Sequence, residues 1–268
     1  MDMKTPVYIE TPFHAFTTAV TENASAEFTF LTSFFPINGA LSSLSRRFFS
    51  IFEPVFELGH SLTRQLTGET ADCLGLLLCI RITQRHAFCL QRRKCPVAES
   101  WINGTNMLLW PRFQSVMDIH IDSLKRATAS VYSSGRATLS LTANKTDNGR
   151  GNVAPSPITQ RFGQLLQGLL LLSSSENFAN ASSGARLAIE GALISSDTEP
   201  VARSLQRLRS EVENFLSKMA KGMGAIRGRK FLANNYNLIL TIIGDTSGTL
   251  AREERGWFAA RLEEVETT

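Results

Sequence analysis

The most regular pattern of hydrophobic and polar residues lies between Leu205 and Ile243. Apolar residues first recur at spacings of three or four, which places them on one side of an α-helix: Leu205, Leu208, Val212, Phe215 and Met219. The residues predicted to face water on the opposite side are charged: Arg207, Arg209, Glu211, Glu213 and Lys218. A glycine-rich basic break separates this helix from a second one, predicted to begin near Phe231. We predict an antiparallel helical hairpin inside a larger helical stack.

Helical spacing of apolar residues extends over most of the remaining chain. Thr11 and Pro12 are suited to the N-cap and first turn of a helix that ends before Pro36. Pro54 is expected to kink or divide a phenylalanine-rich helix, and Pro111 to begin a new one. The remaining helices are predicted over these ranges: 41–58, 69–93, 98–109, 158–172, 185–193 and 249–264.

These patterns predict an all-α protein, because no strand-like alternation and no repeat of fixed period is found. Residues 1–10 are predicted to form a flexible N-terminus, and the Gly-, Asn-, Ser- and Thr-rich residues 135–157 a flexible polar loop. The segments 11–134 and 158–266 are predicted to be helical bundle segments. Because the helices are long and sequential, we expect one continuous elongated rod of stacked antiparallel helical bundles.

The amino-acid composition indicates a folded chain and bears on the class of partner that it binds. Of 268 residues, 43% are hydrophobic and 19% charged, which is typical of a protein with a substantial core. The net charge of +4 arises from 28 basic and 24 acidic residues that are scattered along the chain. This small excess argues against nucleic acid as a partner.

The four cysteines, Cys73, Cys79, Cys89 and Cys95, do not have the spacing of a zinc ribbon. They are predicted to be buried, reduced thiols. The first ten residues do not resemble a secretion signal, so no disulfides are expected. The most apolar runs, 74–82 and 165–172, are shorter than the roughly 20 residues needed to cross a membrane. A soluble cytosolic protein is therefore expected.

Few residues suggest chemistry. Glu57 and His60 have the spacing used in di-iron bundles, but such sites need two of these pairs and two further glutamates. Asp118 and His120 are predicted to point to different sides of a helix. The glycines around Gly224 follow a helix, where a dinucleotide-binding fingerprint would follow a strand. We predict no catalytic residues, no metal and no cofactor.

Four segments of the sequence are distinctive: Asp72–Gly75 with Cys79–Ile82, Trp110–Phe113 continuing to Leu124, Leu208–Phe215 and Phe231–Tyr236. In this order they resemble segments of the vacuolar protein sorting-associated protein 52 family. The resemblance covers most of residues 20–245. Family members are longer at both ends and carry an amino-terminal coiled-coil region. This chain is therefore expected to be a central fragment or a truncated gene product.

The resemblance implies a non-enzymatic scaffold subunit of the Golgi-associated retrograde protein complex, which tethers endosome-derived vesicles at the trans-Golgi network. A related endosome-associated recycling protein complex shares this subunit. Implied partners are the family's sorting subunits 51, 53 and 54, SNARE proteins and a Golgi Rab GTPase, with peripheral membrane association through them. One alternative is a free-standing helical adaptor that binds a single trafficking partner. Another is an unrecognised helical enzyme or metal protein.

Overall fold

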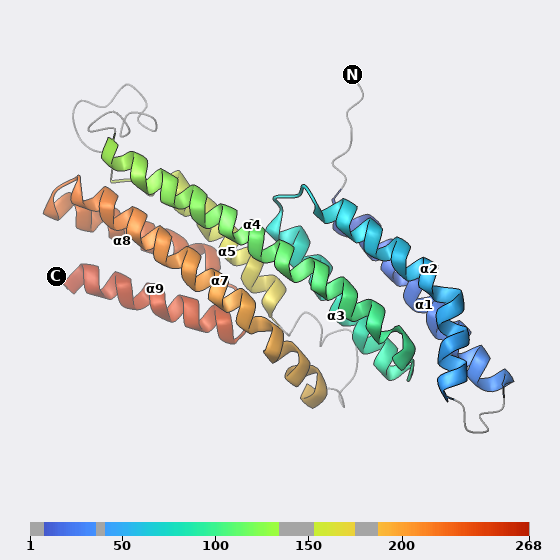
Figure 1. Ribbon diagram of the computed structural model, residues 1–268. Coiled ribbons are helices and arrows are strands. Elements are labelled where there is room, and N and C mark those ends of the chain that lie inside the picture. The colour runs from blue at the N-terminus through green and yellow to red at the C-terminus, as the bar shows by residue number, and fades with distance from the viewer. Residues whose placement is uncertain (1–7, 36–40, 134–152, 175–186, 268) are drawn as a thin grey trace, which may run out of the picture. The chain divides into compact units, whose positions relative to one another are not determined.

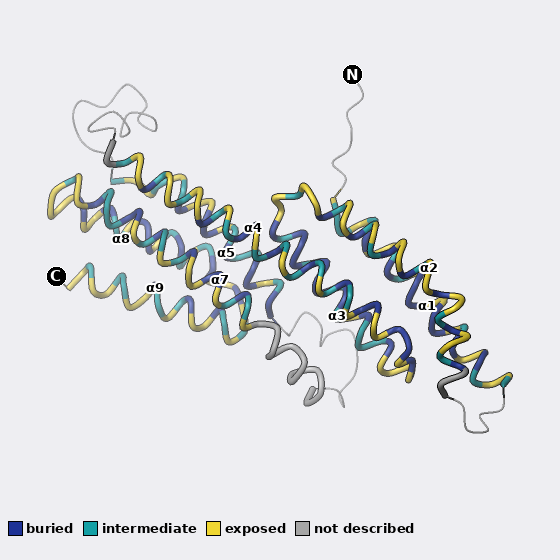
Figure 2. Tube along the Cα trace, in the orientation of Figure 1, coloured by how far each residue is buried: buried dark blue, intermediate teal, exposed yellow. Residues whose placement is uncertain are grey.

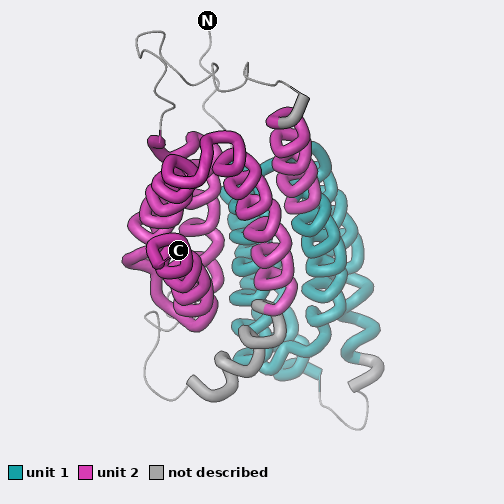
Figure 3. Tube along the Cα trace, turned by 90° about the vertical axis from the view of Figure 1, so that its left-hand side faces the viewer, with its two compact units in different colours: residues 1–116 teal, residues 117–268 magenta. Residues whose placement is uncertain are grey.

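The computed structural model describes residues 8–35, 41–133, 153–174 and 187–267, and every regular element in these ranges is helical (Figure 1). They form eight α-helices and one short 3-10 helix. The predicted all-α helical-bundle class is therefore confirmed. The chain divides into two compact units, residues 1–116 and 117–268 (Figure 3). The rod-like stacking, and the division into segments at residues 135–157, stay predictions.

The first unit is built from long helices connected by short links. They are α1 (Glu10–Phe34), α2 (Leu41–Thr67), α3 (Cys73–Arg92), the 3-10 helix η1 (Pro96–Ala98) and the first part of α4 (Glu99–Ser133). Helix α1 packs against both α2 and α3. The buried side of α1 matches the predicted stripe at Phe13, Val20, Ala24, Phe28 and Leu31.

Aromatic rings fill the core between α2 and its neighbours. Phe48 and Phe52 stack with ring centres 4.6 Å apart. Phe56 stacks on Trp101 of α4 at 5.5 Å, and Phe28 of α1 meets Phe48 edge to face at 6.2 Å. All of these rings are buried. The prediction that the phenylalanines of this helix belong to the core is confirmed for Phe48, Phe52 and Phe56.

Three predicted helix boundaries in this unit are wrong, at Thr11, Leu58 and Pro111; α2 continues past Leu58 to Thr67. Helix α1 begins at Glu10 with Ile9 at the N-cap and no side-chain cap, so Thr11 does not cap it. Pro54 lies inside α2 and Pro111 inside α4, and neither divides its helix. Both prolines are exposed, so their rings and the missing N–H lie on the solvent side. Buried side chains before and after each proline hold the helix together.

Helix α3 begins at a side-chain cap. Asp72 accepts hydrogen bonds from the backbone N–H groups of Leu74 and Gly75, each at 3.0 Å. By length and composition alone α3 could cross a membrane. The apolar run 74–82 had been predicted to be too short for this. However, 56% of its apolar window is buried within the fold, and the core helix of a globular protein passes the same test.

The second unit contains the remainder of α4 with α5 (Pro157–Ser173), α7 (Leu187–Lys221), α8 (Ala225–Ile243) and α9 (Thr249–Thr267). Helix α8 packs against α5, α7 and α9, which makes it the centre of the unit. The short helix predicted at 185–193 is part of the much longer α7, apart from residues 185 and 186, which lie outside the described residues. Most of the predicted loop 135–157 also lies outside them.

The predicted helical hairpin is confirmed as α7 and α8. Its apolar stripe is buried at Leu205, Leu208, Val212 and Phe215. Figure 2 shows buried and exposed positions alternating along the described part of α7. Helix α8 begins at Ala225, six residues before the predicted start at Phe231. The tight turn explains the glycines, because Gly224 has φ +82°, and a Cβ at Gly228 would lie 2.6 Å from the carbonyl oxygen of Ala220.

Candidate interaction surfaces

The tryptophan–proline–arginine–phenylalanine segment holds a turn of the first unit in place. The Arg112 guanidinium donates to the carbonyl oxygen of Thr67 at 2.8 Å and to that of Thr70 at 2.9 Å. These carbonyls end α2 and belong to the link before α3. Phe113 is fully buried and meets Trp110 edge to face at 5.8 Å. The motif therefore has a structural role: it binds the end of α2 and the link before α3 to α4. The spacing of its residues did not predict this role.

We expect Arg112→Lys to destabilise the first unit, because an ammonium cannot reproduce the two forked bonds of the guanidinium. The expected loss is about 1–2 kcal/mol in the free energy of unfolding. Urea denaturation followed by circular dichroism measures it, with Arg64→Lys, exposed on α2, as the matched control. Equal stability of the two variants would show that the two Arg112 hydrogen bonds, the Arg112 clamp, do not contribute to the free energy of unfolding.

An asparagine pair anchors the start of α5 to α8. The Asn235 carbonyl oxygen accepts from the backbone N–H of Ser156 at 2.9 Å and from the Thr159 hydroxyl at 2.6 Å. Its amide donates to the carbonyl oxygen of Phe231 at 2.7 Å, and the side chain is fully buried. Neighbouring Asn234 donates to the carbonyl oxygen of Val153 at 2.9 Å. Both asparagines belong to the family-like segment Phe231–Tyr236.

A buried ion pair joins α7 to α9. Arg209 was predicted to face water, but its side chain is 15% exposed and pairs with Glu254, 5% exposed, at 2.8 Å. The guanidinium also lies over the ring of Trp257, 4.5 Å from its centre. Burial raises the pKa of the Glu254 carboxyl, against the lowering effect of Arg209. At the α9 surface, Arg261 pairs with Glu213 at 3.1 Å.

The thiols are free and mostly buried, as predicted. Cys73, Cys79 and Cys95 are buried, and Cys89 is half-buried. Burial is the main cause that raises the pKa of Cys73 to about 11 and that of Cys79 to about 12. These two thiols stay protonated at neutral pH, which makes them poor nucleophiles and poor metal ligands.

His86 of α3 is a buried group whose titration affects stability in acid. Burial, followed by the nearby His14, lowers its pKa from 6.5 to about 4. Its Nε2 atom lies 3.4 Å from the Thr18 hydroxyl, and Nδ1 is buried without a hydrogen-bond partner. Arg85, Arg93 and Glu22 also act on the ring, with the two arginines lowering the pKa and Glu22 raising it.

We expect His86 to make the first unit less stable in acid. The unfolded histidine takes up a proton near pH 6.5 and the folded one only near pH 4, so stability falls as pH decreases between these values. The full shift corresponds to about 3 kcal/mol. Denaturation of the protein and of His86→Gln across this window measures the effect. An equal pH slope for both proteins would contradict it.

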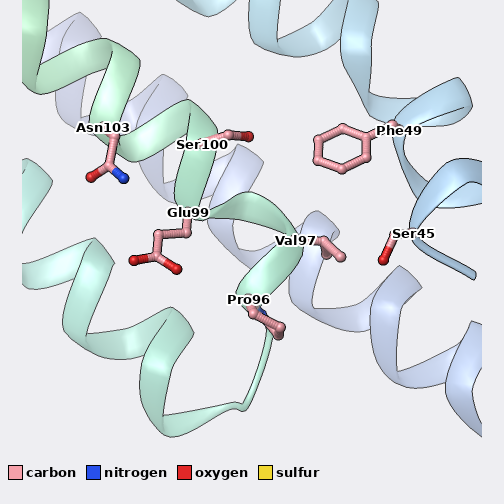
Figure 4. Close-up of a pocket in the computed structure, with 7 residues that line it drawn as sticks. All are labelled: Ser45, Phe49, Pro96, Val97, Glu99, Ser100 and Asn103. Atoms are coloured by element: carbon pink, nitrogen blue, oxygen red, sulfur yellow. The ribbon is translucent and has the colours of Figure 1, made fainter. Parts of the chain in front are cut away.

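The first unit has a shallow open depression between α2 and the start of α4 (Figure 4). It has a volume of about 410 Å³ and is lined by Ser45, Phe49, Pro96, Val97, Glu99, Ser100 and Asn103. Figure 4 shows Val97 and Ser100 turned towards α2, whereas Glu99 turns away. Glu99 is its only ionisable residue. A shallow depression with a single ionisable residue is suited to contact with another surface rather than to catalysis.

A second depression, in the second unit, lies between α4 and α7. Its volume is about 290 Å³, and its lining is largely polar: Ile121, Lys125, Gln206, Arg207, Ser210 and Glu211. Asp118 pairs with Arg207 beside it at 2.8 Å. The charges of this groove are thus partly neutralised within the chain.

The residues singled out for possible metal chemistry do not converge. Glu57 is exposed on α2, whereas His60 contacts the carbonyl oxygen of Trp101 at 3.2 Å. Asp118 is used in its ion pair with Arg207, and the Nε2 atom of His120 has no hydrogen-bond partner. Across the ranges that the structure describes, no group of three or more His, Cys, Asp or Glu side chains could hold a metal ion.

Comparison with known proteins gives a consistent result. The chain is 32% identical to vacuolar protein sorting-associated protein 52 of Schizosaccharomyces pombe over 94% of its own length. It is 30% identical to the Saccharomyces cerevisiae protein of the same name over 85%, and 23% identical to the Homo sapiens homologue over 88%. It spans 43%, 33% and 27% of these relatives, respectively. No solved structure matches the chain.

The family model described as "Vps52, C-terminal" matches residues 2–267. This range contains all the helices described above, including the Arg112 clamp and the Asn235 anchor. The chain therefore belongs to the Vps52 C-terminal family.

Proposed function

We propose that this chain is a non-enzymatic scaffold subunit of a vesicle-tethering complex in endosome-to-trans-Golgi retrograde transport. The observation that carries the proposal is the family match over residues 2–267. The helical build supports it, because a tether subunit needs long surfaces for side-by-side contacts more than an internal cavity. The first depression has one ionisable residue, Glu99, and Arg207 of the second is paired with Asp118.

The proposed partners are the family's sorting subunits 51, 53 and 54, SNARE proteins and a Golgi Rab GTPase. Through them the protein would associate peripherally with the cytoplasmic face of the trans-Golgi network and endosomes. Both depressions are suited to such protein contacts. The second is lined largely by polar residues, and the first by polar and apolar residues.

Affinity capture of the tagged chain from cell extract tests this proposal. We expect the other tether subunits to be recovered at comparable levels, and a variant unfolded by a buried charge at Val212 to recover none. Capture should be repeated with the chain joined to the remainder of its relatives' length, since the chain spans only part of them. Failure to recover tether subunits in both forms would refute the proposal.

A second candidate function is a free-standing helical adaptor that binds a single trafficking partner. The depression between α2 and the start of α4 offers a contact surface for one such partner. Size-exclusion chromatography of cell extract separates the two functions. Elution with a large assembly supports the scaffold, whereas elution as a small complex with one partner supports the adaptor.

A further inference from the structure

The solvent side of α1 is almost free of charge. Among the exposed residues of this helix, Glu22 is the only Asp, Glu, Lys or Arg, and it is paired with Arg93 at 2.8 Å. The outer sides of helices in soluble proteins are normally rich in charged residues. Depletion of charge is instead characteristic of the centre of a protein interface. The outer side of α1 is therefore a candidate contact surface.

The exposed residues of this surface follow a symmetrical pattern of sizes. Six of them form a line that turns gradually around the helix, at spacings of four, four, three, four and four: Ala15, Ala19, Asn23, Ala26, Phe30 and Phe34. Ala15 and Ala19 at the N-terminal end are small, Asn23 and Ala26 lie at the centre, and Phe30 and Phe34 at the C-terminal end are aromatic. Phe30 and Phe34 are 55% and 65% exposed and stack on each other with ring centres 5.4 Å apart. We call this line the α1 ridge.

We propose that the α1 ridge binds the ridge of a second copy of this chain, with the two helices antiparallel about a two-fold axis. An axis midway between residues 24 and 25 places Phe34 opposite Ala15 of the other copy and Phe30 opposite Ala19. Each large ring then meets a small residue, as interdigitating helix surfaces require. A self-complementary surface of this kind is what a two-fold dimer uses.

Helix α2 extends this surface on the same outer side. It exposes Ile51 and Leu58, which are 50% and 60% exposed, with half-buried Val55 and Leu62 between and beyond them. Their spacings of four, three and four are those of a helix seam that packs on another helix. Since α1 and α2 are antiparallel, with Phe28 against Phe48, the centre of the ridge is approximately level with Ile51. The α2 helices of the two copies would therefore also meet.

The available area is sufficient for a dimer. Helix α1 has 25 residues and α2 has 27, so each is about 40 Å long. With a contact strip about 10 Å wide on each helix, one copy would bury roughly 800 Å², which is typical of a stable interface. The α1 ridge itself carries no charged residue, whereas on α2 the exposed Arg47, one turn before Ile51, lies over the Phe35 ring at 4.8 Å.

Sedimentation equilibrium of the chain alone tests the proposal. The decisive variant exchanges a small and a large residue of the α1 ridge. We expect Phe30→Ala to weaken the dimer about tenfold or more by removing two symmetry-related contacts. Ala19→Phe should also weaken it, because two phenylalanines would then compete for one space. The double variant Ala19→Phe, Phe30→Ala should restore dimerisation, since each large residue again faces a small one. Both positions are exposed, and circular dichroism verifies folding.

Three results would overturn the proposal. The first is a monomer at about 100 µM, where a micromolar dimer would be almost fully formed. The second is tighter association of Ala19→Phe alone, which would indicate a nonspecific apolar patch. The third is capture of the monomer by phospholipid vesicles through Phe30 and Phe34, which would indicate a membrane-facing tip. The experiment uses the chain alone, so its result is independent of whether tether subunits are recovered from cells.

Discussion

The variant Val212→Asp is expected to unfold the second unit. Val212 is 1% exposed at the centre of the α7 stripe, and its neighbours Leu208, Phe215 and Leu216 are also buried. An aspartate there would bury a carboxylate without a partner, or force α7 away from α8. Either outcome costs several kcal/mol, which is comparable to the stability of a whole domain. Phe215→Asp should have the same effect, because it lies one turn further along the same stripe.

The measurement is thermal unfolding followed by circular dichroism at 222 nm. We expect loss of helical signal from the second unit at room temperature, with the first unit still folded. Gln206→Asp is the matched control, because Gln206 is exposed on the same helix. It should melt like the unchanged protein. Full helicity and an unchanged melting temperature of Val212→Asp would contradict the burial of Val212 in the second unit.

The variant Asn235→Leu is expected to have the second largest effect. The change keeps the approximate volume but removes the acceptor used by Ser156 N–H and the Thr159 hydroxyl, as well as the donor to Phe231. Each buried group left without a partner costs about 1–3 kcal/mol. Because the Thr159 hydroxyl can turn to a backbone carbonyl of its own helix, we expect a total of about 3 kcal/mol rather than the full sum.

A double-mutant cycle with Thr159→Val isolates the network. Removing the hydroxyl as well as the amide leaves fewer unsatisfied groups, so Asn235→Leu with Thr159→Val should lose less stability than the sum of the single variants. Asn234→Leu is the control, since Asn234 is exposed and makes one bond to Val153. It should cost less than about 1 kcal/mol. Strict additivity in the cycle would show that the Asn235 bonds are independent of Thr159.

Much of the helical core could be predicted from apolar spacing. The buried residues of α1, α2 and α7 match the predicted stripes, because burying one side of an amphipathic helix is the main source of its stability. Helix ends were predicted less well. Local rules predict a kink or break at Pro54 and the start of a new helix at Pro111. However, packing on both sides of each proline keeps the helix continuous. Such packing joins residues that are distant in sequence.

The polar anchors could not be predicted from single residues. Arg209 has the spacing of a solvent-facing position, and only the approach of α9 supplies Glu254 and Trp257 to bury it. Arg112 and Asn235 lie in segments that resemble the family, but their roles depend on the carbonyl and amide groups that other helices bring to them. A hydrogen bond needs both partners within about 3 Å, and spacing along one helix specifies only one of them.

The order of residues along the chain is sufficient to establish that the protein is all-α, which sides of its helices are apolar, and to which family it belongs. These properties depend on local periodicity and on segments that keep their order along the chain. The packing of the helices sets where they end, which charged and polar residues are buried, and which exposed residues form one surface. Those properties depend on contacts between helices far apart in sequence, where the free energy of packing outweighs the preferences of individual residues.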